Sequence, residues 1–152
     1  MRKFIIAIIV LTTSITGIAQ NCEEREKKML GVFGGISAGY LYNAYGLIGS
    51  ISDGYVHDAY DAVTVSELMD AQIKVADNLV KMLEDMNYRE FLKDKKDQDY
   101  TASVINILNG LKKQAQLLED YADNKSRQKQ DAYAAQRKQN WSAISKLMGI
   151  EE

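Results

Sequence analysis

Apolar residues recur every three or four positions over residues 65–92, the spacing of an amphipathic helix. Thr64 and Glu67 precede this stretch at the spacing of a capping box, which closes the first turn of a helix. One polar residue, Gln72, interrupts the apolar stripe. The stripe comprises Val65, Leu68, Met69, Val75, Ala76, Leu79, Met82, Leu83 and Met86. The pattern predicts a helix over 65–92 whose apolar face is buried.

A second stripe predicts a helix over 100–123. Its apolar members are Val104, Leu108, Leu111, Ala115, Leu118 and Ala122. The segment KDKKDQD, residues 93–99, has no apolar member and is interpreted as a solvated linker before this helix. Residues 125–140 are rich in Gln, Lys, Arg and Ala, and an apolar patch of Trp141, Ile144, Leu147 and Met148 follows. Together they predict a basic helix over 126–148 that stops at Gly149. Residues 100–148 could form one helix or two, and we favour a break near Asn124.

Residues 22–52 predict a glycine-rich helix. Glu23 and Glu24 precede Lys27 and Lys28 by four positions, the favourable order for ion pairs on a helix surface. No charged residue follows between Met29 and Ser52. Asp53-Gly54 then resembles a turn.

The first twenty residues have the pattern of a secretory signal peptide. Arg2 and Lys3 precede the apolar run Phe4–Leu11, and Gly17 and Ala19 have the spacing that a signal peptidase recognises. We therefore expect residues 1–19 to be removed and the protein to be exported, to the periplasm or the extracellular space or bound to the envelope. A signal anchor is the alternative, and lipidation of Cys22 is disfavoured because Asn21 precedes it.

The expected fold is all-α, with three or four long amphipathic helices packed as an elongated bundle in one domain, 20–152. The chain has no proline, which suits long helices, and no strand-like alternation of useful length. Without the leader the net charge is near −4, which argues against nucleic-acid binding. Acids cluster over 53–70 and bases over 125–146, and the two segments could face each other or dock on separate partners.

The glycine stretch is the most unusual part of the sequence. On a helix, Gly31, Gly35 and Gly39 form one ridge, with Gly46 near its continuation. Such a ridge lets a second helix approach closely, and we favour a buried helix with this ridge as its packing surface. In this interpretation Phe33, Ile36, Leu41, Leu47, Ile48 and Ile51 fill the core. The alternatives are a membrane-inserted segment over 29–52 and a segment that orders only on assembly.

Little in the sequence indicates catalysis or a cofactor. The single histidine, His57, would share a helix face with Asp53 and Asp61, but a metal site usually needs more ligands. There is no Glu-x-x-His pair for a di-iron bundle, no haem-attachment motif and no phosphate-binding loop. Cys22 is the only cysteine, so no internal disulfide can form. We expect a protein that is not an enzyme and holds no cofactor or metal.

The C-terminal third, about 55 residues, resembles small exported helical proteins encoded in conjugative-transposon transfer modules. The resemblance rests on Asp97 and on the segments Val104-Ile105-Asn106, Gln136-Arg137 and Lys146-Leu147-Met148-Gly149. It implies a part in assembling a DNA-transfer or secretion apparatus and no catalytic residues. The expected function is binding to envelope proteins or to itself through helices. Membrane insertion of 29–52 and binding of a small ligand are the alternatives.

Overall fold

The computed structural model describes residues 2–88 and 91–150, and side chains over 23–86 and 91–150. The described chain is helical with no strand, as the sequence predicts. Its helices are α1 (Arg2–Val56), α2 (Ala62–Tyr88), α3 (Lys95–Asp123) and α4 (Arg127–Met148). The chain separates into two compact units, Met1–Ile36 and Ser37–Glu152. The second unit begins at Ser37 and contains the last turns of α1 with all of α2, α3 and α4.

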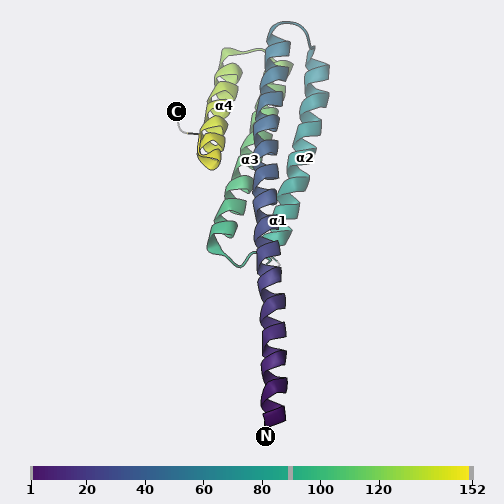
Figure 1. The fold of residues 1–152 in the computed structure, drawn as a ribbon. Helices are drawn as coiled ribbons and strands as arrows, with labels where there is room; N and C mark the ends of the chain where they lie inside the picture. The colour runs from purple at the N-terminus through teal and green to yellow at the C-terminus, as the bar shows by residue number, and fades with distance from the viewer. Residues whose placement is uncertain (1, 89–90, 151–152) are drawn as a thin grey trace. The chain divides into compact units, whose positions relative to one another are not determined.

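Within residues 37–152, consecutive helices run in opposite directions and are joined by short connections (Figure 1). Helix α3 packs against both α2 and α4. The end of α1 contacts α3 where the Tyr55 hydroxyl donates a hydrogen bond of 2.9 Å to the carbonyl of Ala122. It contacts α4 through aromatic rings, with Tyr45 and Trp141 centroids 5.5 Å apart. This is the up-and-down arrangement of a helical bundle.

All four helices contribute to the core of this unit. The largest fully buried apolar side chains are Leu41, Ile48, Val65, Met69, Leu108, Leu118 and Ile144. The stripe predicted on residues 100–123 is confirmed, because each of its six members is buried. The stripe on α2 is wider than the buried face. Leu68, Val75 and Met82 are 37%, 43% and 68% exposed, whereas Val80, outside the predicted stripe, is buried.

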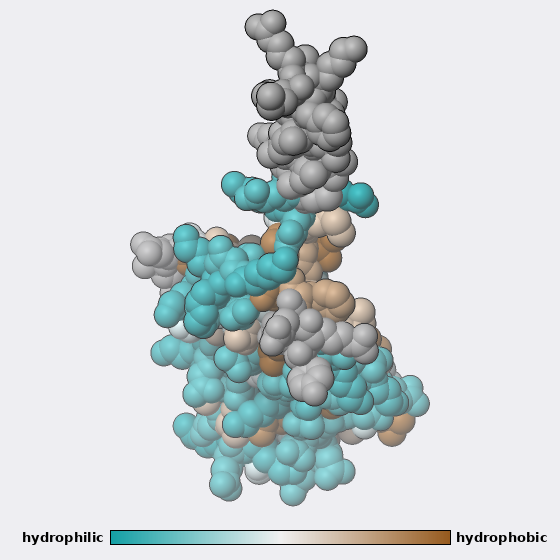
Figure 2. Space-filling model, turned by 90° about the horizontal axis from the view of Figure 1, so that it is seen from below, coloured by the Kyte–Doolittle hydropathy of each residue, from teal (hydrophilic) through white to brown (hydrophobic). Residues whose placement is uncertain are grey.

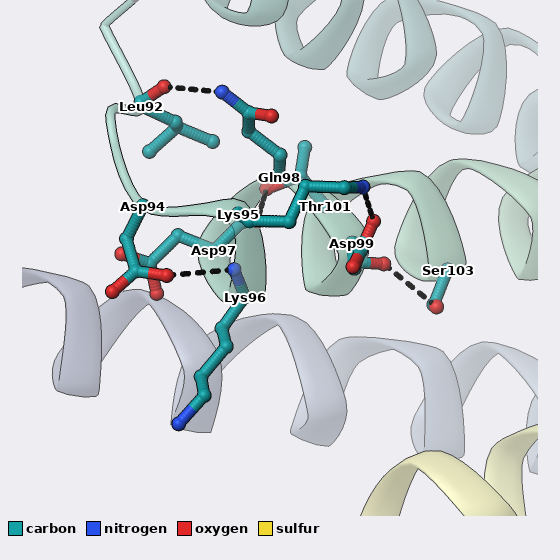
Figure 3. Close-up of polar contacts among 9 residues, drawn as sticks. All are labelled: Leu92, Asp94, Lys95, Lys96, Asp97, Gln98, Asp99, Thr101 and Ser103. Atoms are coloured by element: carbon teal, nitrogen blue, oxygen red, sulfur yellow. Dashed lines mark hydrogen bonds and ion pairs between the residues drawn. The ribbon is translucent and has the colours of Figure 1, made fainter.

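The predicted linker over 93–99 is wrong, because α3 begins at Lys95. Asp94 is its N-cap, and its carboxylate accepts a 2.8 Å hydrogen bond from the backbone amide of Lys96 (Figure 3). Lys95 and Asp99 form an ion pair one turn apart, and the side chain of Gln98 donates to the carbonyl of Leu92 (Figure 3). Polar residues can therefore form this exposed first turn, since capping and local pairs replace apolar burial.

Helix α2 begins and ends earlier than the predicted 65–92. Asp61, not Thr64, caps it, because the Asp61 carboxylate accepts a hydrogen bond of 2.8 Å from the Thr64 backbone amide. The backbone and side-chain hydrogen bonds from Thr64 hold the pKa of the Asp61 carboxyl below its usual value. At its other end α2 stops at Tyr88, and Phe91 and Leu92 lie outside any helix.

The predicted turn at Asp53-Gly54 is also wrong, because α1 continues to Val56. The chain reverses at 57–60, where Asp58 has a positive φ of 57°. The carbonyl of Gly54 accepts hydrogen bonds from the amides of Ala59 and Tyr60, at 2.8 and 3.3 Å. These bonds satisfy a carbonyl at the helix end and explain why the reversal comes after the aspartate and glycine.

The favoured break near Asn124 is confirmed, so residues 100–148 belong to two helices. Asn124 ends α3, and Ser126 caps α4 by accepting a hydrogen bond of 3.3 Å from the Lys129 amide. The predicted stop at Gly149 is confirmed too, since this residue has a φ of 67° in the left-handed region that favours glycine. The basic helix runs over 127–148, close to the predicted 126–148.

Residues 1–22 lie outside the residues whose side chains are described, so the signal peptide over 1–19 and the disfavoured lipidation of Cys22 stay predictions. Among the described residues, no helix is both long and apolar enough to cross a bilayer.

Candidate functional site

Two faces of α1 differ sharply within residues 37–56. The inner face is buried against the other helices of the unit, and its members are Leu41, Ala44, Ile48, Ile51, Ser52 and Tyr55. Their spacing of three or four residues is that of one helix face. This part of the predicted buried helix is correct, because Leu41, Ile48 and Ile51 were expected in the core.

The outer face of α1, defined here as Asn43, Gly46, Leu47 and Ser50, is exposed and carries no charge. Leu47 is 45% exposed, although the sequence placed it in the core. A Cβ atom built on Gly39 or Gly46 would meet no heavy atom within 4 Å. The space in front of these glycines is therefore open within the described chain.

The preceding stretch of α1, residues 23–36, also exposes apolar side chains when it is considered by itself, although residues 23–28 are charged. Met29, Val32 and Ile36 are 63%, 61% and 68% exposed. A Cβ atom on Gly31 or Gly35 likewise meets nothing within 4 Å. Ile36 was expected in the core, and that expectation is wrong. Lys28 and Glu24 form an ion pair of 2.7 Å on the exposed surface of this stretch.

Within residues 37–56, Gly39 and Gly46 thus lie outside the face of α1 that the bundle covers, and no helix of the described chain packs on them. The predicted packing of the bundle's own helices against these two glycines is therefore wrong. A contact between the ridge and a different chain is untested and stays a prediction.

In Figure 2 the visible surface is mostly hydrophilic, with hydrophobic patches between the polar regions.

A second feature, the α1–α4 groove, lies between the end of α1 and α4. Tyr45 of α1 stacks at a tilt of 32° on Trp141 of α4. The guanidinium of Arg137 lies 5.8 Å from the centre of the Tyr45 ring. A Cβ on Gly49 would come within 2.8 Å of that guanidinium, so glycine at this position admits the arginine. Arg137 also forms an ion pair with Asp53, at 3.9 Å.

Arg137 remains charged in this setting. Its partial burial lowers its pKa, but hydrogen bonding to Tyr45 and the electrostatic influence of Tyr133 and Asp53 raise the pKa overall. The Arg137–Asp53 pair joins the basic and acidic segments of the sequence at one point. Sequence reasoning did not find this groove, because its residues come from separate helices. In the sequence, only Gly49 and the aromatic residues on both helices could have indicated the groove.

Helices α3 and α4 meet through buried amides. Asn140 donates a hydrogen bond of 2.8 Å to Gln114 and accepts one of 3.0 Å from Gln136. Gln114 is completely buried, and its amide nitrogen has no hydrogen-bond partner in the described chain. A buried polar network of this kind is weak as a source of stability and better suited to fixing the register of two helices.

The structure does not bring Asp53, His57 and Asp61 together on a helix face. His57 lies in the turn after α1, where its Nδ1 is 2.8 Å from the carbonyl of Asp53. The carboxylate of Asp61 caps α2 instead. Among the described residues, no group of three or more His, Cys, Asp or Glu side chains is placed to hold a metal ion.

Comparison of the chain with protein-family models, with curated proteins and with solved structures found no match. A function must therefore be inferred from the residues themselves.

Proposed function

We propose that the protein is an exported, non-enzymatic helical protein that acts by binding other proteins of the cell envelope through the outer face of α1. The observation that carries this proposal is the exposure of an uncharged helix face around Gly46 and Leu47. A solvated helix face normally carries charged residues. This one carries none, although charged residues occupy 26% of the positions in the whole sequence.

The chemistry of this face favours another helix as its partner. Gly39 and Gly46 leave space for a second backbone to approach closely, as small residues do at close helix contacts. Leu47 supplies apolar surface whose burial contributes about 25 cal/mol for each Å² removed from water. The partner surface should therefore be a helix with small and apolar residues. A second copy of this chain would satisfy the same requirement.

A role in a conjugative transfer or secretion apparatus rests on the resemblance of the C-terminal third, together with the predicted signal peptide. In such an apparatus a small exported bundle would act as a structural or assembly component. Its contribution would be the surface it presents to its neighbours.

Site-specific photo-crosslinking in cells tests this proposal. A photoreactive residue at Asn43, on the outer face, should capture one defined protein or a second copy of this chain. The same residue at Asp131, which is exposed on α4, serves as the matched control and should capture neither. Reaction at Asn43 with lipid, combined with co-flotation of the purified chain with liposomes in high salt, would instead support membrane insertion of residues 29–52. Equal capture at both positions would contradict the proposal.

A further inference from the structure

The α1–α4 groove is large enough to hold a small molecule. Its volume is about 450 Å³, within the range of about 300–1,000 Å³ that is typical of ligand pockets. Its walls come from α1, α4 and one residue of α3, Tyr121. The groove belongs wholly to the unit 37–152 and does not involve the outer face of α1. Ligand binding in the groove is therefore independent of the proposed function.

One wall of the groove carries positive charge. Arg137 and Lys138 line it together with a single carboxylate, Asp53. The side chain of Arg137 is 37% exposed, and its distance of 3.9 Å to Asp53 is longer than a hydrogen bond. The guanidinium of Arg137 can therefore still bind a second carboxylate, because its forked N–H groups match the geometry of the two carboxylate oxygens. Two cations and one anion leave one positive charge, which matches a singly charged anion better than a phosphate dianion.

The other walls are aromatic. Tyr45 and Trp141 present rings whose centres are 5.5 Å apart, and Tyr121 adds a third. Tyr133 lines the same groove, is 5% exposed, and has a hydroxyl with no hydrogen-bond partner in the described chain. Because this hydroxyl is closed off from solvent, Tyr133 contributes to the groove wall without offering a hydrogen bond to a ligand. Aromatic rings favour flat apolar ligands through offset or edge-to-face packing.

We propose that the α1–α4 groove binds a small carboxylate that carries a flat apolar ring. The carboxylate pairs with the guanidinium of Arg137, and the ring packs against Trp141 and Tyr45. Lys138 adds long-range attraction for the anion, and Asp53 disfavours ligands with two negative charges.

The chain contains one tryptophan, Trp141, so intrinsic fluorescence reports on this groove directly. Phenylacetate is the probe, and titration of the purified protein should give a saturable change in Trp141 fluorescence in the millimolar range or tighter. Phenylacetamide, which has the same shape without the charge, and acetate, which lacks the ring, should bind at least about tenfold more weakly, equivalent to about 1.4 kcal/mol. Inorganic phosphate should compete poorly. Absence of a saturable response, or an equal response to phenylacetamide, would overturn the proposal.

Variants locate the binding within the groove. Arg137→Gln should weaken phenylacetate binding by about tenfold or more, as expected for the loss of a charge-assisted hydrogen bond. Arg137→Lys keeps the charge without the planar fork and should lie between this variant and the original protein. Lys146→Gln, in the last turn of α4 and outside the groove, is the charge-matched control and should bind normally. Helical circular dichroism checks the folding of each variant. Unchanged binding by folded Arg137→Gln would contradict the assignment of the carboxylate site.

Discussion

Leu47 and Ile48 are neighbours in the sequence, yet one is 45% exposed and the other 1% exposed. Both belong to the same uncharged stretch, Met29 to Ser52. The inner face of α1 lacks charge because it is buried in the bundle. The outer face has no such reason, since a charged side chain there would remain in water. Burial in the bundle therefore accounts for the uncharged inner face, whereas the uncharged outer face is accounted for only by the proposed partner.

The two faces should differ most in how much they contribute to folding stability. Ile48→Ala should lower the free energy of unfolding by about 2–5 kcal/mol, because it leaves a cavity in the core. Leu47→Ala removes a partly solvated side chain and should cost about 1 kcal/mol or less. Chemical denaturation of the two variants provides the measurement. Similar losses at both positions would show that the two faces are not distinct.

The direction in which each helix buries its apolar residues could largely be predicted from the sequence. The stripe on α3 is regular and the helices packed against α3 cover all of it, so the predicted and the buried positions agree. On α2 the stripe is wider than the face that the bundle covers, and Leu68, Val75 and Met82 remain exposed. Hydrophobic periodicity gives the direction of a helix face, but the number of neighbouring helices determines how wide the buried strip is.

Helix ends and polar contacts were less predictable. Asp61 and Asp94 both cap helices, and aspartate is a favourable N-cap residue. The sequence pattern instead favoured Thr64 as the cap of α2 and assigned Asp94 to a charged linker. The buried amides of Gln114 and Asn140 could not be expected, because polar residues are normally assigned to the surface. The same holds for the α1–α4 groove, whose residues are brought together only by tertiary packing.

Two tyrosines of α1, one buried and one exposed, should differ by a smaller amount in their contribution to folding stability. Tyr55 is buried, and its hydroxyl bonds to the carbonyl of Ala122 near the end of α3. Tyr55→Phe should therefore cost about 1–1.5 kcal/mol of unfolding free energy. Tyr42 is 48% exposed, so Tyr42→Phe should have little effect. Thermal or chemical unfolding checks both, and a silent Tyr55→Phe would mean that this hydrogen bond does not hold α1 to α3.

Two glycines three residues apart give the smallest and most specific contrast. Gly46→Ala should raise the free energy of unfolding by up to about 1 kcal/mol, because alanine has the higher helix propensity and its Cβ enters open space. Gly49→Ala should show no such gain, because the new methyl group displaces the guanidinium of Arg137. Denaturation curves for the pair provide the measurement. A comparable gain at both positions would contradict the close approach of Arg137 to α1.

The most direct test of the outer face as a binding surface measures both folding stability and crosslinking to a partner in one variant. In Gly46→Leu the larger side chain points into open space within this chain but into the position where a partner helix would approach. We predict that purified Gly46→Leu unfolds at the same temperature as the original protein or a higher one. In cells, the same variant should no longer form the crosslink from Asn43. A stable Gly46→Leu variant that retains the crosslink would contradict the proposed role of this face.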